Sequence, residues 1–195
     1  MSDDIVIVSA ARTPMGAFQG DFTSLSAHDL GGIAIKAAVE RAGISPDAVD
    51  EVLFGNCLMA GQGQAPARQA GFKGGLPKSA GAVTLSKMCG SGMRAAMFAH
   101  DMLAAGTADV VVAGGMESMT NAPHLLLKGR SGIRIGHDRI YDHMMLDGLE
   151  GADWAAKLDS HGGVLNRHIQ GLLRIAEALN RRERTETAAL HRGCR

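Results

Sequence analysis

Short apolar runs alternate with helix-patterned segments over the first 118 residues, and this alternation most narrows the folds that the chain can adopt. The apolar runs predict strands at residues 3–9, 51–57, 81–86 and 108–118. The segments between them predict helices at residues 26–43, 66–75 and 93–106. Because strands and helices alternate, we expect an α/β fold with a mainly parallel sheet. The first run is apolar on both faces, which favours a central position in that sheet.

Capping residues predict where the first helices begin and end. Ser26 and Asp29 have the spacing of a capping box, in which each side chain accepts a hydrogen bond from the other residue's backbone N–H. Gly43 is a typical helix stop. Ser45, followed by Pro46, predicts the N-terminus of a further short helix.

Cys89 lies on the turn between the strand at 81–86 and the helix that ends at Gly106. Unpaired backbone N–H groups and the helix dipole make that end of a helix electropositive, which favours the reactive thiolate. Gly90 and Gly92 carry no side chain that would keep a substrate carbonyl away from the backbone. Free cysteines are also common in protein cores. The residues alone therefore leave two interpretations open, an activated nucleophile and a buried core thiol.

Composition argues against several classes of function. Lys and Arg together number 20, as do Asp and Glu, so no net field attracts nucleic acid or a membrane surface. The three cysteines, Cys57, Cys89 and Cys194, have neither metal-site nor CxxC spacing. Gly114 and Gly115 lack the GxGxxG spacing of a dinucleotide site, and no GxxxxGKS or GxxxxGKT pattern occurs. Without a signal peptide or a long apolar stretch, we expect the chain in the reducing cytoplasm.

Four motifs follow one another within roughly residues 4–150. They are VSAARTPMGAFQG, GNCLMAGQGQAPARQAG, LSKMCGSGMRA and VVVAGGMESMTNAPH. Together they resemble the N-terminal half of a thiolase, of the acetyl-CoA acetyltransferase type. Ser86 stands where many members carry Asn, and this departure leaves the pattern intact.

The resemblance implies a layered fold. A thiolase has two similar α/β halves, with a loop domain inserted in the first half. We therefore expect residues 1–120 to form the thiolase-like N-terminal α/β core, incomplete without its sister half. Residues 121–150 would begin the inserted loop domain, and residues 151–195 would form a divergent basic tail.

The resemblance also implies a role for Cys89, which stands in KMCGSGM at the position of the acyl-accepting cysteine. Cys89 would attack an acyl-CoA thioester and become S-acylated. A second acetyl-CoA, deprotonated at its α-carbon, would attack the acyl-enzyme to give acetoacetyl-CoA, and the reverse reaction is thiolysis. Acetyl-CoA and other acyl-CoA thioesters are thus the expected substrates, with no separate cofactor and no metal.

Partner groups for Cys89 are scarce in these 195 residues. Thiolases supply a base histidine from a Gly-His-Pro segment and a second cysteine from a Cys-x-Gly-Gly-Gly segment, and neither motif occurs here. His100 would lie about 16 Å from Cys89 along one helix, too far to act as its base, and we expect it to be partly buried. We interpret Glu117 and Ser118 as structural loop residues rather than acid–base groups.

Two functions of different classes stay open. The first is thiolase-type acyl transfer, as an acetyl-CoA C-acetyltransferase whose chain is incomplete. The second is a catalytically inactive module that binds acyl-CoA or a protein partner. If completed, the protein would form a homo-oligomer through the sheet edges of its first half, as family members do.

The composition changes after about residue 150. Seven of the 14 arginines fall within residues 167–195, and residues 172–190 could form one charged helix. A shifted reading frame near residue 150 would produce arginine-rich peptide of this kind. A divergent but folded loop domain is the alternative.

Overall fold

The computed structural model describes residues 5–150 and 187–192 of the chain. The helices and strands are, in order, β1 (Ile5–Ala11), α1 (Ala27–Ala42), η1 (Pro46–Ala48), β2 (Glu51–Gly55), α2 (Pro66–Lys73), β3 (Gly81–Leu85), α3 (Ser91–Ala105), β4 (Val110–Gly115), η2 (Met119–Asn121), β5 (His124–Leu125), β6 (Tyr141–Asp142), η3 (Met144–Leu149) and β7 (Thr187–Arg192). In the part of the chain that the structure describes, no helix is both long and apolar enough to cross a membrane.

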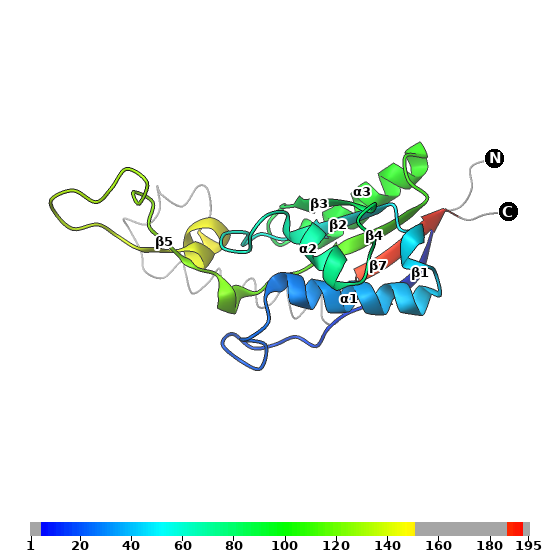
Figure 1. Cartoon of the computed structure of the whole chain (residues 1–195), viewed down its shortest axis with the longest axis horizontal. Helices are drawn as coiled ribbons and strands as arrows, with labels where there is room; N and C mark the ends of the chain where they lie inside the picture. The colour runs from blue at the N-terminus through cyan, green and yellow to red at the C-terminus, as the bar shows by residue number, and fades with distance from the viewer. Residues whose placement is uncertain (1–4, 151–186, 193–195) are drawn as a thin grey trace.

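One five-stranded sheet organises the molecule, with the strand order β1-β7-β4-β2-β3 (Figure 1). β2 is parallel to both β3 and β4, whereas β7 runs antiparallel to both of its neighbours, β4 and β1. Four strands therefore point the same way, and the predicted α/β fold with a mainly parallel sheet is confirmed.

The predicted central position of the first strand is wrong. β1 is an edge strand, because β7 inserts between it and β4. Several of its apolar side chains are also open to solvent, and Ile7 is 65% exposed. Apolar residues on both faces of a strand are thus compatible with an edge, and they do not by themselves fix its place in the sheet.

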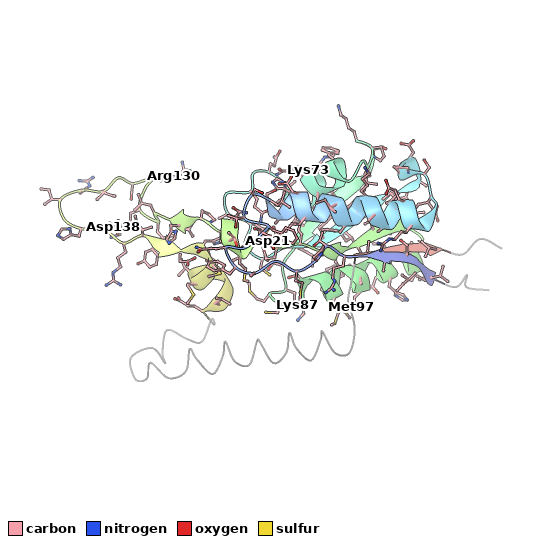
Figure 2. The ribbon with its side chains drawn as sticks, turned by 90° about the horizontal axis from the view of Figure 1, so that it is seen from below. Asp21, Lys73, Lys87, Met97, Arg130 and Asp138 are labelled. Carbon is pink, nitrogen blue, oxygen red and sulfur yellow. The ribbon has the colours of Figure 1, made fainter. Side chains whose placement is uncertain are left out.

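Helices cover both faces of the sheet. α1 and α2 pack on one face over Val52, Phe54 and Val112, and α3 packs on the other over Leu53 and Val111. Figure 2 shows Lys73, at the end of α2, on one side of the sheet and Met97 of α3 on the opposite side. Because successive strand residues point to opposite faces, the apolar residues of β2 and β4 supply both cores.

The helix termini form as predicted. Ser26 is the N-cap of α1, and the capping box with Asp29 is complete. The helix ends at Gly43, whose φ of 68° lies in the left-handed region that favours glycine. Ser45 caps η1 with Pro46 at its start. Local capping patterns are therefore reliable in this part of the chain.

β7 departs from the sequence prediction. Residues 187–190 form part of a strand, not the end of a charged helix. The strand supplies backbone partners to the facing edges of β1 and β4, and this tertiary pairing outweighs local helix propensity. The rest of the predicted basic tail and Cys194 lie outside the described residues.

The segment after β4 leaves the sheet. β5 and β6 pair antiparallel and close a loop that projects away from the core, with Arg130 and Asp138 near its far end (Figure 2). The π-helix η3 follows, and its Gly148 lies against the Leu58 side chain of the loop after β2. The sequence predicts an irregular excursion here but neither this short ladder nor the π-helix.

Candidate active site

A pocket of about 300 Å³ opens at the carboxyl ends of the parallel strands. Cys57 follows β2, Cys89 follows β3 and Glu117 follows β4, and all three line the pocket. The pairing register explains the meeting, since Gly55, the last residue of β2, is opposite both Leu85 and Gly115. Loops that follow neighbouring parallel strands converge at one edge of the sheet, where α/β proteins bind their ligands.

Cys89 is exposed and lies two residues before the start of α3, as its turn position in the sequence predicts. Met88 precedes it with a φ of 47°, a left-handed conformation that costs free energy in a residue with a side chain. Ser91 closes the turn: its hydroxyl donates to the Met88 carbonyl at 2.6 Å and accepts from the Lys87 N–H at 2.8 Å. The thiol therefore stands at the N-terminal end of a helix, on a hydrogen-bonded turn that faces the pocket.

Two backbone segments meet closely behind this turn. A Cβ atom added to Gly55 would lie 2.5 Å from the carbonyl carbon of Ser91 and 2.6 Å from the nitrogen of Gly92. Both atoms are backbone, so no side-chain rotation could relieve the clash. Because residue 55 is a glycine, the end of β2 can pack directly against the first turn of α3.

Glu117 is a carboxylate enclosed by N–H donors. Its Oε2 accepts from the Cys57 N–H at 2.8 Å, and its Oε1 accepts from the Leu58 N–H at 3.2 Å and from the side-chain amide of Asn56. Burial raises the pKa of Glu117, while the hydrogen bonds from the Cys57 and Leu58 N–H groups oppose the rise because they favour the charged form. Its contacts are those of a residue that orders a loop, yet it also lines the pocket.

Cys57 is a second thiol in the same pocket. Its Sγ donates to the Met88 carbonyl oxygen at 3.2 Å and lies 3.5 Å from the Ser91 hydroxyl. Burial raises the pKa of the Cys57 thiol, and the negative charge of Glu117 raises it further. The two pocket thiols therefore differ in setting: Cys89 is exposed, whereas Cys57 is half-buried beside a carboxylate.

η3 lines the same pocket as Cys89, and His143, directly before η3, contacts the loop after β2. The buried imidazole accepts from the Ala60 N–H through Nε2 at 3.2 Å, so its other nitrogen, Nδ1, carries a proton and donates to Asp147 at 2.6 Å. Met144 and Leu149 of the same segment line the pocket. Apolar side chains thus form much of the pocket lining beside the thiol, where they would contact a bound acyl group.

Other residues singled out in the sequence lie elsewhere. His100 is exposed rather than partly buried, because it is one position past the buried stripe of Ala95, Ala99 and Leu103 on α3. Ser118 is placed as a loop residue, and its hydroxyl accepts from the side-chain amide of Asn121. Within residues 5–150, no three His, Cys, Asp or Glu side chains form a group that could hold a metal ion.

Cys57 and Glu117 were not predicted as parts of a site with Cys89. Neither stands in a local pattern of nucleophile and base, and their separations of 32 and 28 residues from Cys89 carry no signal. A usable signal was present in the strands: each residue follows the carboxyl end of an apolar run, and such ends meet in a parallel sheet.

Comparison with known proteins shows the family that the chain resembles. A sequence profile described as thiolase, N-terminal domain, matches residues 5–183. An acetyl-CoA acetyltransferase of Cupriavidus necator is 47% identical over 166 residues, which is 85% of this chain and 41% of that protein. Acetyl-CoA acetyltransferase 2 of Arabidopsis thaliana is 53% identical over 146 residues, 75% of this chain and 36% of that protein.

A solved structure has the same fold. The Acat5 thiolase of Ascaris suum, in complex with coenzyme A, matches with a TM-score of 0.73 at 40% sequence identity. The match covers 76% of this chain and 38% of that chain. The chain thus spans about two fifths of the length of the proteins it resembles.

Proposed function

Because the chain belongs to the thiolase family through its N-terminal domain, we propose that it performs the acyl-accepting step of an acetyl-CoA C-acetyltransferase, with Cys89 as the nucleophile. The observation that carries this proposal is the position of Cys89: an exposed thiol at the N-terminal end of α3, facing an apolar pocket. The names of the relatives and the coenzyme A complex of the Ascaris thiolase support the substrate class.

In the proposed step, the Cys89 thiolate attacks the carbonyl carbon of acetyl-CoA. A bond forms between Sγ and that carbon, the carbon–sulfur bond to coenzyme A breaks, and the coenzyme A thiolate leaves and takes up a proton. Negative charge develops on the carbonyl oxygen, and the positive end of the α3 dipole, next to Cys89, would favour it.

Condensation with a second acetyl-CoA needs more than these residues supply. A base must remove the α-proton, and the Gly-His-Pro and Cys-x-Gly-Gly-Gly segments that provide the proton-transfer groups in thiolases are absent from these 195 residues. We therefore propose that acetoacetyl-CoA formation or thiolysis is carried out by a protein that contains both this N-terminal half and those segments. In that protein, residues 121–150 would begin the loop domain that contacts coenzyme A.

We further propose a homo-oligomer for that protein, and the cytoplasm as its compartment. A relative from Gibberella zeae, 50% identical over 145 residues, is described as a cytosolic acetyl-CoA acetyltransferase, which supports the compartment.

Mapping a labelled acetyl group tests the proposed nucleophile. The full chain, with and without an added C-terminal thiolase half, is incubated with [14C]acetyl-CoA, digested and analysed by mass spectrometry. Label on the peptide that contains Cys89, lost in Cys89→Ala, is the expected result. Label on Cys57 or Cys194 that persists in Cys89→Ala would contradict it.

Turnover provides a separate prediction. The 195-residue chain alone should show no measurable acetoacetyl-CoA thiolysis, because removing members of a catalytic unit costs orders of magnitude in rate. Thiolysis is followed by the loss of acetoacetyl-CoA absorbance, with the chain plus a C-terminal half as the positive control. Robust activity of the homogeneous chain alone would refute the prediction. Binding of acetyl-CoA without label transfer in both samples would favour the inactive acyl-CoA-binding module.

A further inference from the structure

The proposed acyl transfer leaves one nucleophilic group of the pocket without a task. Cys57 is 32 residues from Cys89 in the sequence, but its thiol contacts the turn that carries Cys89. The contact is a hydrogen bond of 3.2 Å from the Cys57 thiol to the carbonyl oxygen of Met88, the residue directly before the nucleophile.

The Met88 carbonyl helps to hold the conformation of the turn. Met88 has a φ of 47°, a conformation that a residue with a side chain keeps only when its surroundings hold it there. The Met88 carbonyl accepts from the Ser91 N–H at 3.0 Å and from the Ser91 hydroxyl at 2.6 Å, both donors within the turn itself. Cys57 adds a donor from a different strand end and so ties the turn to the sheet.

Cys57 is in turn held by Glu117. The carboxylate accepts from the backbone N–H of Cys57 at 2.8 Å and of Leu58 at 3.2 Å, and the side-chain amide of Asn56 donates to it as well. A continuous chain of contacts therefore runs from the end of β4, through the end of β2, to the turn after β3.

The electrostatic setting keeps Cys57 a donor. Burial raises the pKa of its thiol, and the negative charge of Glu117 acts in the same direction. A thiol that stays protonated can donate its S–H to a carbonyl but is a poor nucleophile. The same carboxylate thus orders the Cys57 backbone and suppresses the thiolate that would compete with Cys89.

We propose that Cys57 is a positioning residue for Cys89, which holds the Met88–Cys89 peptide in place through its S–H bond to the Met88 carbonyl and is itself anchored by Glu117. The part of this proposal that concerns acyl transfer rests on the proposed function. The part that concerns the turn stands on the contacts alone.

Amide hydrogen exchange on the full chain tests the turn directly, without any reaction at Cys89. The amides of Gly90 and Ser91 donate within the turn and report on its opening. Cys57→Ala and Cys57→Val both remove the donor, one leaving a gap and the other filling it. Cys57→Ser keeps a hydroxyl donor at the same place, and exchange at Val110–Ala113 of β4 reports whether each variant is folded.

The donor-deficient variants should exchange the Gly90 and Ser91 amides about fivefold faster than wild type, the effect of one ordinary hydrogen bond. Cys57→Ser should stay within twofold of wild type. Glu117→Gln should accelerate exchange both at Cys57 and Leu58 and in the turn, whereas Cys57→Val should affect the turn alone. If the β4 amides of Cys57→Ala lose their protection from exchange, that variant is not folded. The comparison of Cys57→Val with Cys57→Ser then still tests the proposal.

A second readout connects the turn to the chemistry. The initial rate of Cys89 labelling by [14C]acetyl-CoA should fall about fivefold in Cys57→Val and recover in Cys57→Ser, since a directed attack needs the turn in place. Alkylation of Cys89 by iodoacetamide should change less than twofold, because Cys89 stays exposed.

The outcomes separate the two proposals. Wild-type exchange rates at Gly90 and Ser91 in both Cys57→Ala and Cys57→Val would overturn the positioning role, as would equal effects of Ser and Val. Absence of acetyl label on wild-type Cys89, with iodoacetamide still reacting, would instead overturn the proposed function and leave the exchange result to decide on Cys57.

Discussion

At the scale of one residue, the space around Gly55 excludes any side chain. A methyl group there would overlap the Ser91 carbonyl carbon and the Gly92 nitrogen, and both are backbone atoms of the turn that leads from Cys89 into α3. We predict that Gly55→Ala lowers the free energy of unfolding by about 3 kcal/mol, at the upper end of overpacking costs, since neither segment can yield without moving a strand or a helix. Urea unfolding measures the change.

Gly71 provides the matched control. It is also buried, but a Cβ added there would lie 3.6 Å from the nearest side-chain atom, Cγ2 of Val52, an ordinary contact. Gly71→Ala should be neutral or stabilise by up to about 1 kcal/mol, because alanine favours the helix. Equal destabilisation by both variants would show that the closeness of Gly55 to α3 is not the cause.

At the scale of an element, α1 owes part of its stability to the Asp29 carboxylate. This group accepts from the backbone N–H of the N-cap Ser26 and forms an ion pair with Lys73 of α2. The Lys73 hydrogen bond lowers the pKa of Asp29, and the bond from Ser26 adds to the effect. The Lys73 side chain is 41% exposed, so water screens the pair, and we expect Asp29→Asn to cost only about 1 kcal/mol at pH 7.

The cost of Asp29→Asn should depend on pH with a definite sign. Because the pKa of Asp29 is lower in the folded chain than in the unfolded chain, the wild type's advantage is complete above the ordinary carboxyl pKa of about 4. It shrinks as the pH falls through the lowered value. Unfolding of both proteins at pH 7, 5 and 3 checks this, and a difference that grows in acid would contradict it.

The elements also show which features the sequence could predict. The ends of α1 follow from Ser26, Asp29 and Gly43, because caps are local contacts within a few residues. The turn position of Cys89 was predictable for the same reason. The sequence could not predict the order of β1 and β7 in the sheet, because strand pairing at large sequence separation leaves no local pattern. In addition, the composition of residues 187–190 fits a helix equally well.

The candidate site likewise has one part that the sequence predicts and another that it does not. Cys89 stands between a strand signal and a helix signal, and this local context singled it out. Cys57 and Glu117 became part of the site only through the register of β2 with β3 and β4, which brings three strand ends together. For these two residues the signal in the sequence is their place after an apolar run, and that signal does not say which strand ends meet.

At the scale of the whole molecule, α3 leaves an apolar stripe uncovered in the described structure. Met93, Met97 and Phe98 are 56%, 49% and 39% exposed, on the face of the helix away from the sheet. Such a stripe favours association between molecules. We predict that the pair Met93→Glu and Met97→Lys reduces self-association without lowering thermal stability, because Glu and Lys four residues apart also support the helix.

Sedimentation velocity over a range of protein concentrations measures the association, and thermal unfolding measures the stability. Ile33→Lys on α1 is the control, since Ile33 is 53% exposed but lies on the opposite side of the sheet. Association reduced equally by Ile33→Lys would show that general surface polarity, rather than the α3 stripe, governs it.

The place of β7 in the sheet has a consequence for the time course of synthesis. Ile5 pairs with Arg192, so β1, at the start of the chain, cannot pair with β7 until the residues near 190 have been synthesised. Translation of the 72 residues from Gly115 to Thr187 takes roughly 4 to 14 s at 5–20 residues per second. During that interval β2, β3 and β4 can already form a parallel unit, while β1 has no β7 to join it to β4. Synthesis therefore allows the nascent chain to assemble its three converging strand ends before its sheet is complete, and we expect its longest-range pairing to form last.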